Sequence, residues 1–268
     1  MKQALNVASV EGFIEGSGDQ ALVMIHGWPD TYRIWSAQVE YFKNHYRCAY
    51  FTLPGFEPNA KPPQAKQAFS LDQVIEVIKA VVDEASPTQP VHLMLHDWGC
   101  FFGYQFALRY SQRVASIIGV DVGDANSRAF RASLGPKQIA LIAGYQLPLL
   151  SAWRIGGRIG NQLARGVAKV LKAPSDPALI HANMGYPYYI QWTQRYGSYK
   201  AARDLDFSCP VLYIYARHKP IMFHSRQWLT QLEQQPGSAV VAMNTSHWAM
   251  VEQPELFNQI VHDWLKKY

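Results

Sequence analysis

The chain has 268 residues, of which 49% are hydrophobic and 17% charged, so it can bury a sizeable core and is not a disordered protein. Its length favours one large domain with an insertion. Three cysteines lie far apart, which excludes a disulfide framework and a CxxC zinc site. The longest apolar-rich stretch, 139–153, is shorter than the roughly 18 residues of a membrane span, and the N-terminus lacks the apolar segment of a secretion signal. We therefore expect a soluble, cytoplasmic protein.

The net charge of +5 is unevenly distributed along the chain. Segment 125–175 contains eight Lys or Arg residues and no Asp or Glu, and taking these eight charges from +5 leaves −3 on the rest. Within this segment, apolar residues recur at every fourth position, as on one face of a helix: Ile155, Ile159, Leu163, Val167 and Leu171. We expect this face to pack on the body of the protein. The alternative is a surface that meets anionic lipid or an acidic ligand.

Short apolar runs alternate with helical patterns along most of the chain. The first 20 or so residues predict an antiparallel hairpin. Further strands are predicted at 21–25, 47–52, 91–95, 115–122, 210–215 and 239–243. Helices are predicted at 31–44, 70–85, 100–110, 223–234 and 254–266, with Ser70 as an N-cap. Strands separated by helices predict an α/β fold, in which a parallel sheet has helices on both faces.

Residues 125–204 break this alternation. We interpret them as a mostly helical cap inserted between two strands of the sheet. Residues 1–124 and 205–268 then form the core. In a parallel sheet covered by helices, the chemistry lies where strands end and helices begin, so the cap would lie over the reacting groups.

One strand end has the pattern of a nucleophile elbow. The apolar strand 91–95 runs into a sharp turn, His96-Asp97-Trp98-Gly99, and then into an aromatic-rich helix. Asp97 stands where a serine hydrolase places its hydroxyl. The pattern Gly-x-Ser-x-Gly occurs nowhere in the sequence, which disfavours a serine esterase or lipase.

Three motifs resemble those of the α/β-hydrolase superfamily: His26-Gly27-Trp28-Pro29-Asp30, the elbow His96-Asp97-Trp98-Gly99, and Ser246-His247-Trp248 followed by Glu252-Gln253-Pro254. More narrowly, they resemble its aspartate-nucleophile branch, the soluble epoxide hydrolases and haloalkane dehalogenases. The resemblance covers nearly the whole chain and is weakest in the cap. It implies the α/β-hydrolase fold, with a mostly parallel eight-stranded sheet, helices on both faces and a helical lid.

The chemistry expected of Asp97 differs from that of a serine. With an ordinary pKa of about 3.9, an aspartate is already ionised at neutral pH and can displace a leaving group at a saturated carbon, which forms an alkyl ester. His247 follows the last predicted strand and would activate water against that ester. The backbone N–H groups of Trp28 and Trp98 would hold the developing oxyanion.

The third member of the triad is open between two residues. Many relatives carry the acid after the strand that follows the cap, but Lys219 stands at that place here. Other relatives place it after the strand that follows the elbow helix, where Asp121 stands. We expect Asp121 to orient His247, with Asp124 as the alternative.

The resemblance leaves the substrate open between an epoxide and an alkyl halide. Epoxide hydrolases use lid tyrosines to protonate the oxygen that leaves carbon. By their distances from the elbow and the histidine, Tyr145 and Tyr189 occupy these places. Dehalogenases hold the halide with N–H donors, but Trp28 replaces their usual asparagine. We therefore expect epoxide hydrolysis to a vicinal diol through an alkyl-aspartate intermediate, with haloalkane dehalogenation as the first alternative and a non-catalytic ligand-binding protein as the second.

We expect few further partners. No histidine pair has metal spacing, so neither a metal nor another cofactor is predicted. No known module pattern supports nucleic-acid binding. The expected substrate is a small apolar epoxide or alkyl halide, and the sequence leaves the oligomeric state open.

Overall fold

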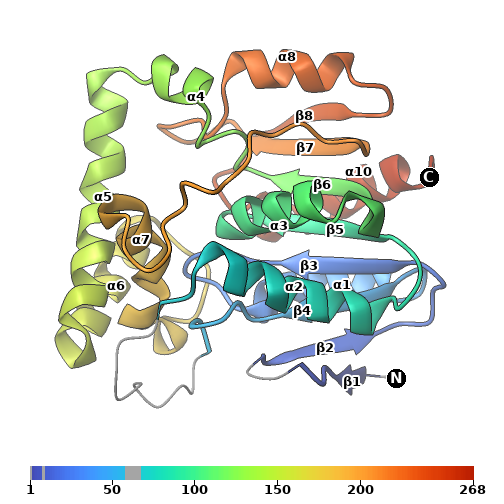
Figure 1. The fold of residues 1–268 in the computed structure, drawn as a ribbon, viewed down its shortest axis with the longest axis horizontal. Coiled ribbons are helices and arrows are strands. Elements are labelled where there is room, and N and C mark those ends of the chain that lie inside the picture. The colour runs from blue at the N-terminus through green and yellow to red at the C-terminus, as the bar shows by residue number, and fades with distance from the viewer. Residues whose placement is uncertain (1, 8–9, 58–67) are drawn as a thin grey trace.

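The computed structural model describes residues 2–7, 10–57 and 68–268. An eight-stranded sheet runs through the molecule in the order β1-β2-β4-β3-β5-β6-β7-β8 (Figure 1). The pairs β1/β2 and β2/β4 are antiparallel, and all others are parallel. The strands are β1 (Lys2–Ala4), β2 (Gly12–Glu15), β3 (Ala21–Ile25), β4 (Arg47–Phe51), β5 (Val91–His96), β6 (Val114–Val120), β7 (Val211–Ala216) and β8 (Ala239–Met243). The predicted leading hairpin and mostly parallel α/β sheet are confirmed.

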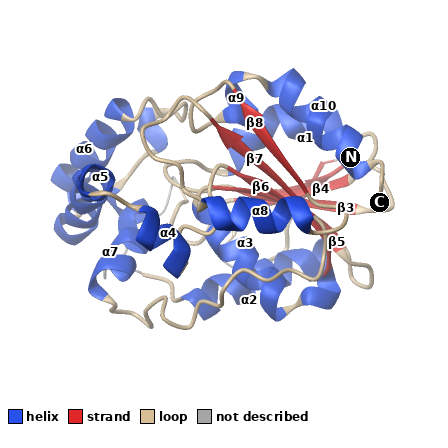
Figure 2. Ribbon diagram, turned by 90° about the horizontal axis from the view of Figure 1, so that it is seen from above, coloured by secondary structure: helices blue, strands red, loops and turns tan. Residues whose placement is uncertain are grey.

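Helices cover both faces of this sheet (Figure 2). Successive residues of a strand point to opposite faces, so Val23 and Leu93 face one layer and Met24 and Met94 the other. The first layer contains α2 (Leu71–Ala85), α3 (Trp98–Arg109) and α8 (Arg226–Gln234). The second contains α1 (Ser36–Phe42), α9 (Ala249–Glu252) and α10 (Pro254–Leu265). Residues Tyr32–Trp35, within the predicted helix 31–44, form a short 3-10 helix before α1.

Helix α2 begins and packs as the sequence predicts. The hydroxyl of Ser70 accepts a hydrogen bond from the N–H of Gln73, and the Gln73 side chain accepts one from the N–H of Ser70. This reciprocal pair satisfies two backbone donors that would otherwise lack partners at the start of the helix. Val74, Ile78 and Val82 are buried on the side that faces the sheet.

The segment between β6 and β7 is helical throughout its regular structure. It contains α4 (Arg128–Ser133), α5 (Pro136–Ile155), α6 (Gly157–Val170) and α7 (Tyr186–Thr193), with 3-10 turns at Pro177–Leu179 and Ala182–Gly185. Figures 1 and 2 place α5, α6 and α7 beyond one end of the sheet. None of the described helices combines the length and apolar composition that a membrane span requires.

The packing predicted for the stripe from Ile155 to Leu171 is found for only part of it. Gly156 separates α5 from α6, and the buried face of α6 consists of Gly160, Ala164 and Ala168. Leu163 and Val167 of the stripe are half-buried and pack against the core, but Ile155, Ile159 and Leu171 are exposed. The periodicity correctly indicated a helix with an apolar face, but periodicity alone does not say that the face with the largest side chains is the buried one.

Candidate active site

Asp97 lies in the turn between β5 and α3, with φ 53° and ψ −121°. Such a conformation is strained for any residue other than glycine, and persists only where the surrounding structure enforces it. Here the chain turns sharply because α3 packs directly against β3. A Cβ at position 99 would lie 2.1 Å from the carbonyl oxygen of Ile25, so Gly99 is needed at that approach. The turn thus has the sharp strand-to-helix geometry that the sequence predicts for a nucleophile elbow.

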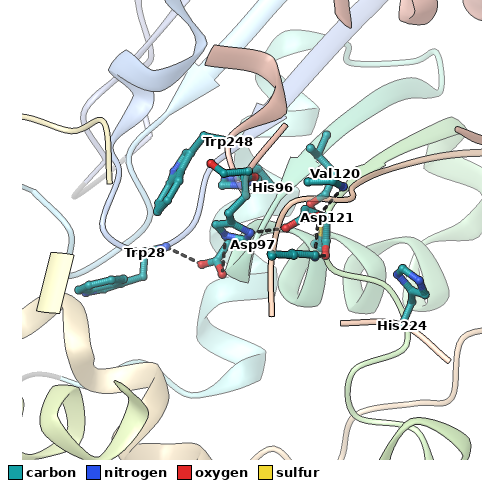
Figure 3. Close-up of polar contacts among 12 residues, drawn as sticks. Trp28, His96, Asp97, Val120, Asp121, His224 and Trp248 are labelled. Carbon is teal, nitrogen blue, oxygen red and sulfur yellow. Dashed lines mark hydrogen bonds and ion pairs between the residues drawn. The ribbon is translucent and has the colours of Figure 1, made fainter. Parts of the chain in front are cut away.

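Two backbone N–H groups hold the Asp97 carboxylate. The N–H of Trp28 donates to Asp97 Oδ1 at 2.7 Å (Figure 3). A Cβ at position 27 would lie 2.2 Å from the same oxygen, so Gly27 is required for this approach. The N–H of Trp98 also donates to Asp97 and helps to lower the pKa of its carboxyl. Both predicted oxyanion donors therefore meet at this carboxylate.

His26 fixes the loop that carries Trp28. Burial lowers the pKa of His26 to about 4, so the ring is neutral at physiological pH. Its Nε2 accepts a hydrogen bond from the N–H of Leu53 at 2.9 Å, and Nδ1 donates to the carbonyl of Gly27 at 2.8 Å. The loop is therefore tied to the segment that follows β4.

His247 lies between two carboxylates. Its Nε2 is 3.5 Å from Asp97 Oδ2, and its Nδ1 is hydrogen-bonded to Asp121 Oδ2. Burial alone would lower the pKa of His247, but the hydrogen bonds and charges of Asp121 and Asp97 outweigh burial and raise this pKa to about 9. In turn, His247 lowers the pKa of the Asp97 carboxyl, although burial acts in the opposite direction.

Asp121 follows β6 and faces a buried lysine as well as the histidine. Its Oδ1 accepts the N–H of Ala216 at 2.9 Å and lies 2.6 Å from Lys219 Nζ. Lys219 Nζ also donates to the Asp121 carbonyl at 3.1 Å. Burial would raise the pKa of Asp121, but the charges of Lys219 and His247 lower it. Lys219, which the sequence marked only as a departure from the family pattern, is therefore a counterion of the predicted acid.

Asp124, the alternative acid, has a different environment. Its Oδ1 accepts the N–H of Ser225, and its Oδ2 accepts the hydroxyls of Ser225 and Ser127. Those two serines cap α8 and α4. The structure thus places Asp121 beside His247, and places Asp124 at two helix starts.

A cavity of about 670 Å³ opens over Asp97. Its walls include Trp98 and Phe101 of α3 and two tyrosines of the inserted segment, Tyr145 and Tyr188. The ring of Tyr188 contacts that of Trp98 edge-on at 5.3 Å between centroids and that of Tyr145 at 6.1 Å. Gln146 Nε2 donates to the Tyr145 hydroxyl at 2.9 Å.

The prediction for Tyr189 is wrong in position. Its ring packs on Trp153, with centroids 4.2 Å apart, and Tyr189 is absent from the walls of this cavity. Tyr188 takes the place expected of it. Neighbouring residues of a helix point in directions about 100° apart, so an error of one residue selects the wrong face.

The sequence also assigned no role to Asp30, although it quoted the motif that contains it. Asp30 is fully buried and accepts hydrogen bonds from Trp248 Nε1 at 3.0 Å and from the Ser175 hydroxyl. Burial raises its pKa to about 6, against the opposing effect of these donors. Ser175 belongs to the inserted segment, so this carboxylate links that segment to the loop after β3.

Two other histidines near the site have structural partners. His96 Nε2 is 3.0 Å from the carbonyl of His247, and His224 Nδ1 is 2.9 Å from the Tyr213 hydroxyl. Across residues 2–7, 10–57 and 68–268, no cluster of His, Cys, Asp and Glu side chains is arranged to hold a metal ion.

Residues 22–260 match the model of the alpha/beta hydrolase family. The chain belongs to this family. It is 21% identical over 272 residues to epoxide hydrolase 3 of Xenopus tropicalis, an alignment that covers 94% of this chain and 73% of that protein. It is 22% identical over 273 residues to epoxide hydrolase 1 of Caenorhabditis elegans, covering 94% and 67%.

Among solved structures, the chain resembles a mutant epoxide hydrolase of Bacillus megaterium bound to its product, a naphthyloxy-propane-1,2-diol. The TM-score is 0.75 at 19% identity, and the match covers 99% of this chain and all of that one. At this identity the structural likeness establishes the shared fold. The relatives named here are epoxide hydrolases, so the chain is an epoxide hydrolase-like member of the family.

Proposed function

We propose that this alpha/beta hydrolase opens epoxides to vicinal diols through an alkyl ester on Asp97. The observation that carries the proposal is the pairing of an ionised carboxylate, held at a strained turn beside His247, with two tyrosines in the wall of the same cavity. The epoxide hydrolases among its relatives support the substrate class.

In the first step, Asp97 attacks a carbon of the epoxide. Its pKa is lowered, so it is anionic, and its Oδ1 is engaged by Trp28 while Oδ2 remains to attack. An oxygen–carbon bond forms at Asp97 as a carbon–oxygen bond of the epoxide breaks. The alkoxide that leaves is strongly basic and needs a proton. Burial and the charge of Asp97 raise the pKa values of Tyr145 and Tyr188, which keeps both hydroxyls protonated and able to donate.

In the second step, water attacks the carboxyl carbon of the ester. The N–H groups of Trp28 and Trp98 already surround this carboxylate and would stabilise the oxyanion. Esterification removes the negative charge of Asp97, which is one of the two that raise the pKa of His247 to about 9. The pKa of His247 then falls, and the neutral imidazole can take the proton of water while Asp121 stabilises the resulting cation. The ester carbon–oxygen bond then breaks as the leaving oxygen takes the proton held by His247, and the diol leaves. The second proton of the attacking water returns to the tyrosinate formed in the first step, and the Asp97 carboxylate is regenerated.

Lys219 has a positioning role in this scheme. It neutralises Asp121 from the side opposite His247, so the four groups Asp97, Asp121, His247 and Lys219 carry two negative and, with the histidine protonated, two positive charges. A buried cluster without the lysine would hold the proton of His247 more tightly. Lys219 thus keeps the imidazole basic enough to act but able to lose its proton.

Haloalkane dehalogenation remains a second candidate because of one side chain. The indole Nε1 of Trp28 is buried and has no hydrogen-bond partner among the described residues. A halide ion could accept a hydrogen bond from this indole N–H and a second one from Trp98. The paired tyrosines favour the epoxide, since a halide leaves as a stable anion and needs no proton.

The His247→Gln variant tests the two-step scheme. With His247 lost, the first step proceeds but hydrolysis stalls, so the alkyl-enzyme should accumulate on Asp97 and be visible by intact-protein mass. His218→Gln, a change at an exposed histidine, should turn over normally and show no adduct. Repeated turnover of the unmodified enzyme in heavy-oxygen water should place label in Asp97. An inactive His247→Gln variant that never gains mass with any substrate would rule out the covalent intermediate.

The substrate class is tested on the same protein with styrene-type epoxides, fatty epoxides and bromoalkanes. Diol formation supports the proposal, whereas bromide release without diol would replace it with dehalogenation. Tight binding of all three without product would support a ligand-binding protein.

A further inference from the structure

The outer face of α6 exposes large apolar side chains to solvent. Ile155, Ile159 and Val170 are 54%, 66% and 80% exposed. Ile159 and Val170 lie on the same side of α6, about three turns apart, and Ile155 ends α5 just before α6 begins. Large aliphatic side chains this exposed, beside basic residues on an amphipathic helix, indicate an interaction surface.

The packing of α6 explains why this face points outward. The buried side carries only Gly160, Ala164 and Ala168. A Cβ at position 160 would lie 2.4 Å from the carbonyl oxygen of Ala152 and 2.9 Å from Cβ of Ala182, so no larger residue fits there. The small residues let α6 lie directly against α5 and the 3-10 turn Ala182–Gly185. Leu163 and Val167, beside this side, are half-buried against the core, whereas Ile159 and Val170 contribute little to internal packing.

Basic side chains run along the same outer face. Arg158, Arg165 and Lys169 are all exposed and border the apolar row on one side of the helix. Arg165 donates to the carbonyl of Ile180, and no carboxylate of the described residues forms an ion pair with Arg158 or Lys169. Segment 125–175 has no acidic residue, while the rest of the chain is net negative. The field over α6 is therefore positive.

We propose that the outer face of α6 binds the surface of an anionic lipid bilayer. A helix that lies in the plane of such a surface buries its apolar row at the headgroup boundary while the flanking cations contact anionic headgroups. Figures 1 and 2 both place α6 at the end of the molecule turned away from the sheet, where it can meet a flat surface. Three exposed cations spaced along α6 beside exposed apolar side chains fit a bilayer better than an acidic protein, which would need individual complementary pockets.

This surface adds to the proposed function without depending on it. Helix α5, against which α6 packs, also supplies Ile142 and Tyr145 to the wall of the cavity over Asp97. Docking through α6 would therefore hold the cavity close to a source of lipophilic substrate. Whatever the reaction turns out to be, the lipid binding can be measured by itself.

The test is co-sedimentation of the whole protein with vesicles of phosphatidylcholine alone or mixed with phosphatidylserine. We expect binding to the mixed vesicles only, weakened by added salt. At about fivefold per cation near the surface, Arg158→Glu with Lys169→Glu should bind at least roughly 25-fold more weakly. Ile159→Ser with Val170→Ser should weaken binding about tenfold through the lost apolar contact.

The matched control is Leu256→Ser with Lys267→Glu, which removes one exposed apolar residue and reverses one exposed cation on and after α10. This control should bind as the unmodified protein does, and thermal unfolding should show all variants folded. Three results would overturn the proposal: no binding to the mixed vesicles, equal binding to both vesicle types, or equal loss in the control. A dimer in lipid-free solution that Ile159→Ser dissociates would assign the face to a second copy of the chain instead.

Discussion

Asp97, Asp121 and His247 lie in loops that follow three strands of the sheet, whereas Tyr145 and Tyr188 lie within helices of the inserted segment. On the sheet side, each carboxylate receives a backbone N–H, from Trp28 or Ala216, and at least one charged partner. On the inserted side, the tyrosine rings are held by edge-on aromatic contacts, with a hydrogen bond from Gln146 to one of them.

This difference indicates how each side should respond to change. The sheet-side groups form one electrostatic unit, in which the charge of each sets the pKa of the next, so the loss of one group changes the others. The proposed function gives the two tyrosines one task, and their rings contact each other edge-on. The loss of one hydroxyl keeps this ring contact and leaves the other hydroxyl in place. The chemistry should therefore be most sensitive at the sheet.

The largest effect that separates the sheet-side carboxylates is expected for Asp121→Asn. The amide cannot stabilise the His247 cation, so hydrolysis of the ester should slow by roughly 10³-fold to 10⁴-fold. Alkylation of Asp97 should be much less affected, so the intermediate should build up in a burst experiment. Asp124→Asn is the control: it should lower stability by about 1–2 kcal/mol through lost caps and change the hydrolysis rate little. The reverse ranking of the two variants would assign the acid to Asp124.

The position of the sheet-side residues was predictable for a physical reason. In a parallel sheet the carboxyl ends of strands meet at one edge, so once 91–95 and 115–122 are recognised as strands, Asp97 and Asp121 must lie near each other. The order of elements then brings the loop of His247 to the same edge. Sequence reasoning could not show that Lys219 faces Asp121, because that contact joins two loops whose conformations depend on the whole fold.

The inserted segment was less predictable because its helices pack on one another and not on a sheet. The choice between Tyr188 and Tyr189 depends on the rotation of α7, and a shift of one residue turns the side chain by about 100°. The orientation of α6 depends on Gly160, Ala164 and Ala168, whose close packing outweighs the burial of the larger Ile159. Apolar periodicity carries no information about such backbone contacts.

The second prediction tests the inserted segment with substitutions at two adjacent tyrosines of α7. Tyr188→Phe should slow alkylation of Asp97 by an epoxide about 10-fold to 100-fold, because one of two proton donors is lost. Tyr189→Phe should stay within about twofold, since that hydroxyl lies outside the cavity. Single-turnover measurement of the alkylation rate separates this step from hydrolysis. A larger loss in Tyr189→Phe than in Tyr188→Phe would show that the inserted segment rearranges when substrate binds.

A smaller and pH-dependent effect is expected for Lys219→Met. Without the lysine, the negative charge of Asp121 acts on His247 unopposed, so the pKa of His247 should rise both in the free enzyme, where it is about 9, and in the alkyl-enzyme. Because hydrolysis needs the neutral imidazole, the rate at neutral pH should fall about tenfold per unit of pKa and recover as the pH is raised. Lys219→Arg, which keeps the cation, should retain most of the rate and the original profile. A uniform loss at every pH would assign Lys219 to structural stability instead of to the pKa of His247.

The last prediction concerns the stability of the fold instead of the reaction rate. It rests on Asp30, which accepts a hydrogen bond from Ser175 and so joins the loop after β3 to the inserted segment. Burial raises the pKa of Asp30 to about 6, so the folded state favours the protonated carboxyl. The stabilisation from Asp30 is therefore complete below its ordinary pKa and is lost as the pH rises through about 6. Asn cannot ionise, so Asp30→Asn should gain about 2 kcal/mol of unfolding free energy over the unmodified protein between roughly pH 4 and pH 8. Urea unfolding at both pH values measures this difference, and other titrating groups cancel in it. Ser175→Ala, with Asp30 kept, removes a hydrogen bond that lowers the pKa of Asp30. In this variant the loss of stability should extend to higher pH. If the difference between Asp30→Asn and the unmodified protein is the same at both pH values, the buried carboxylate does not couple the inserted segment to the sheet through its charge.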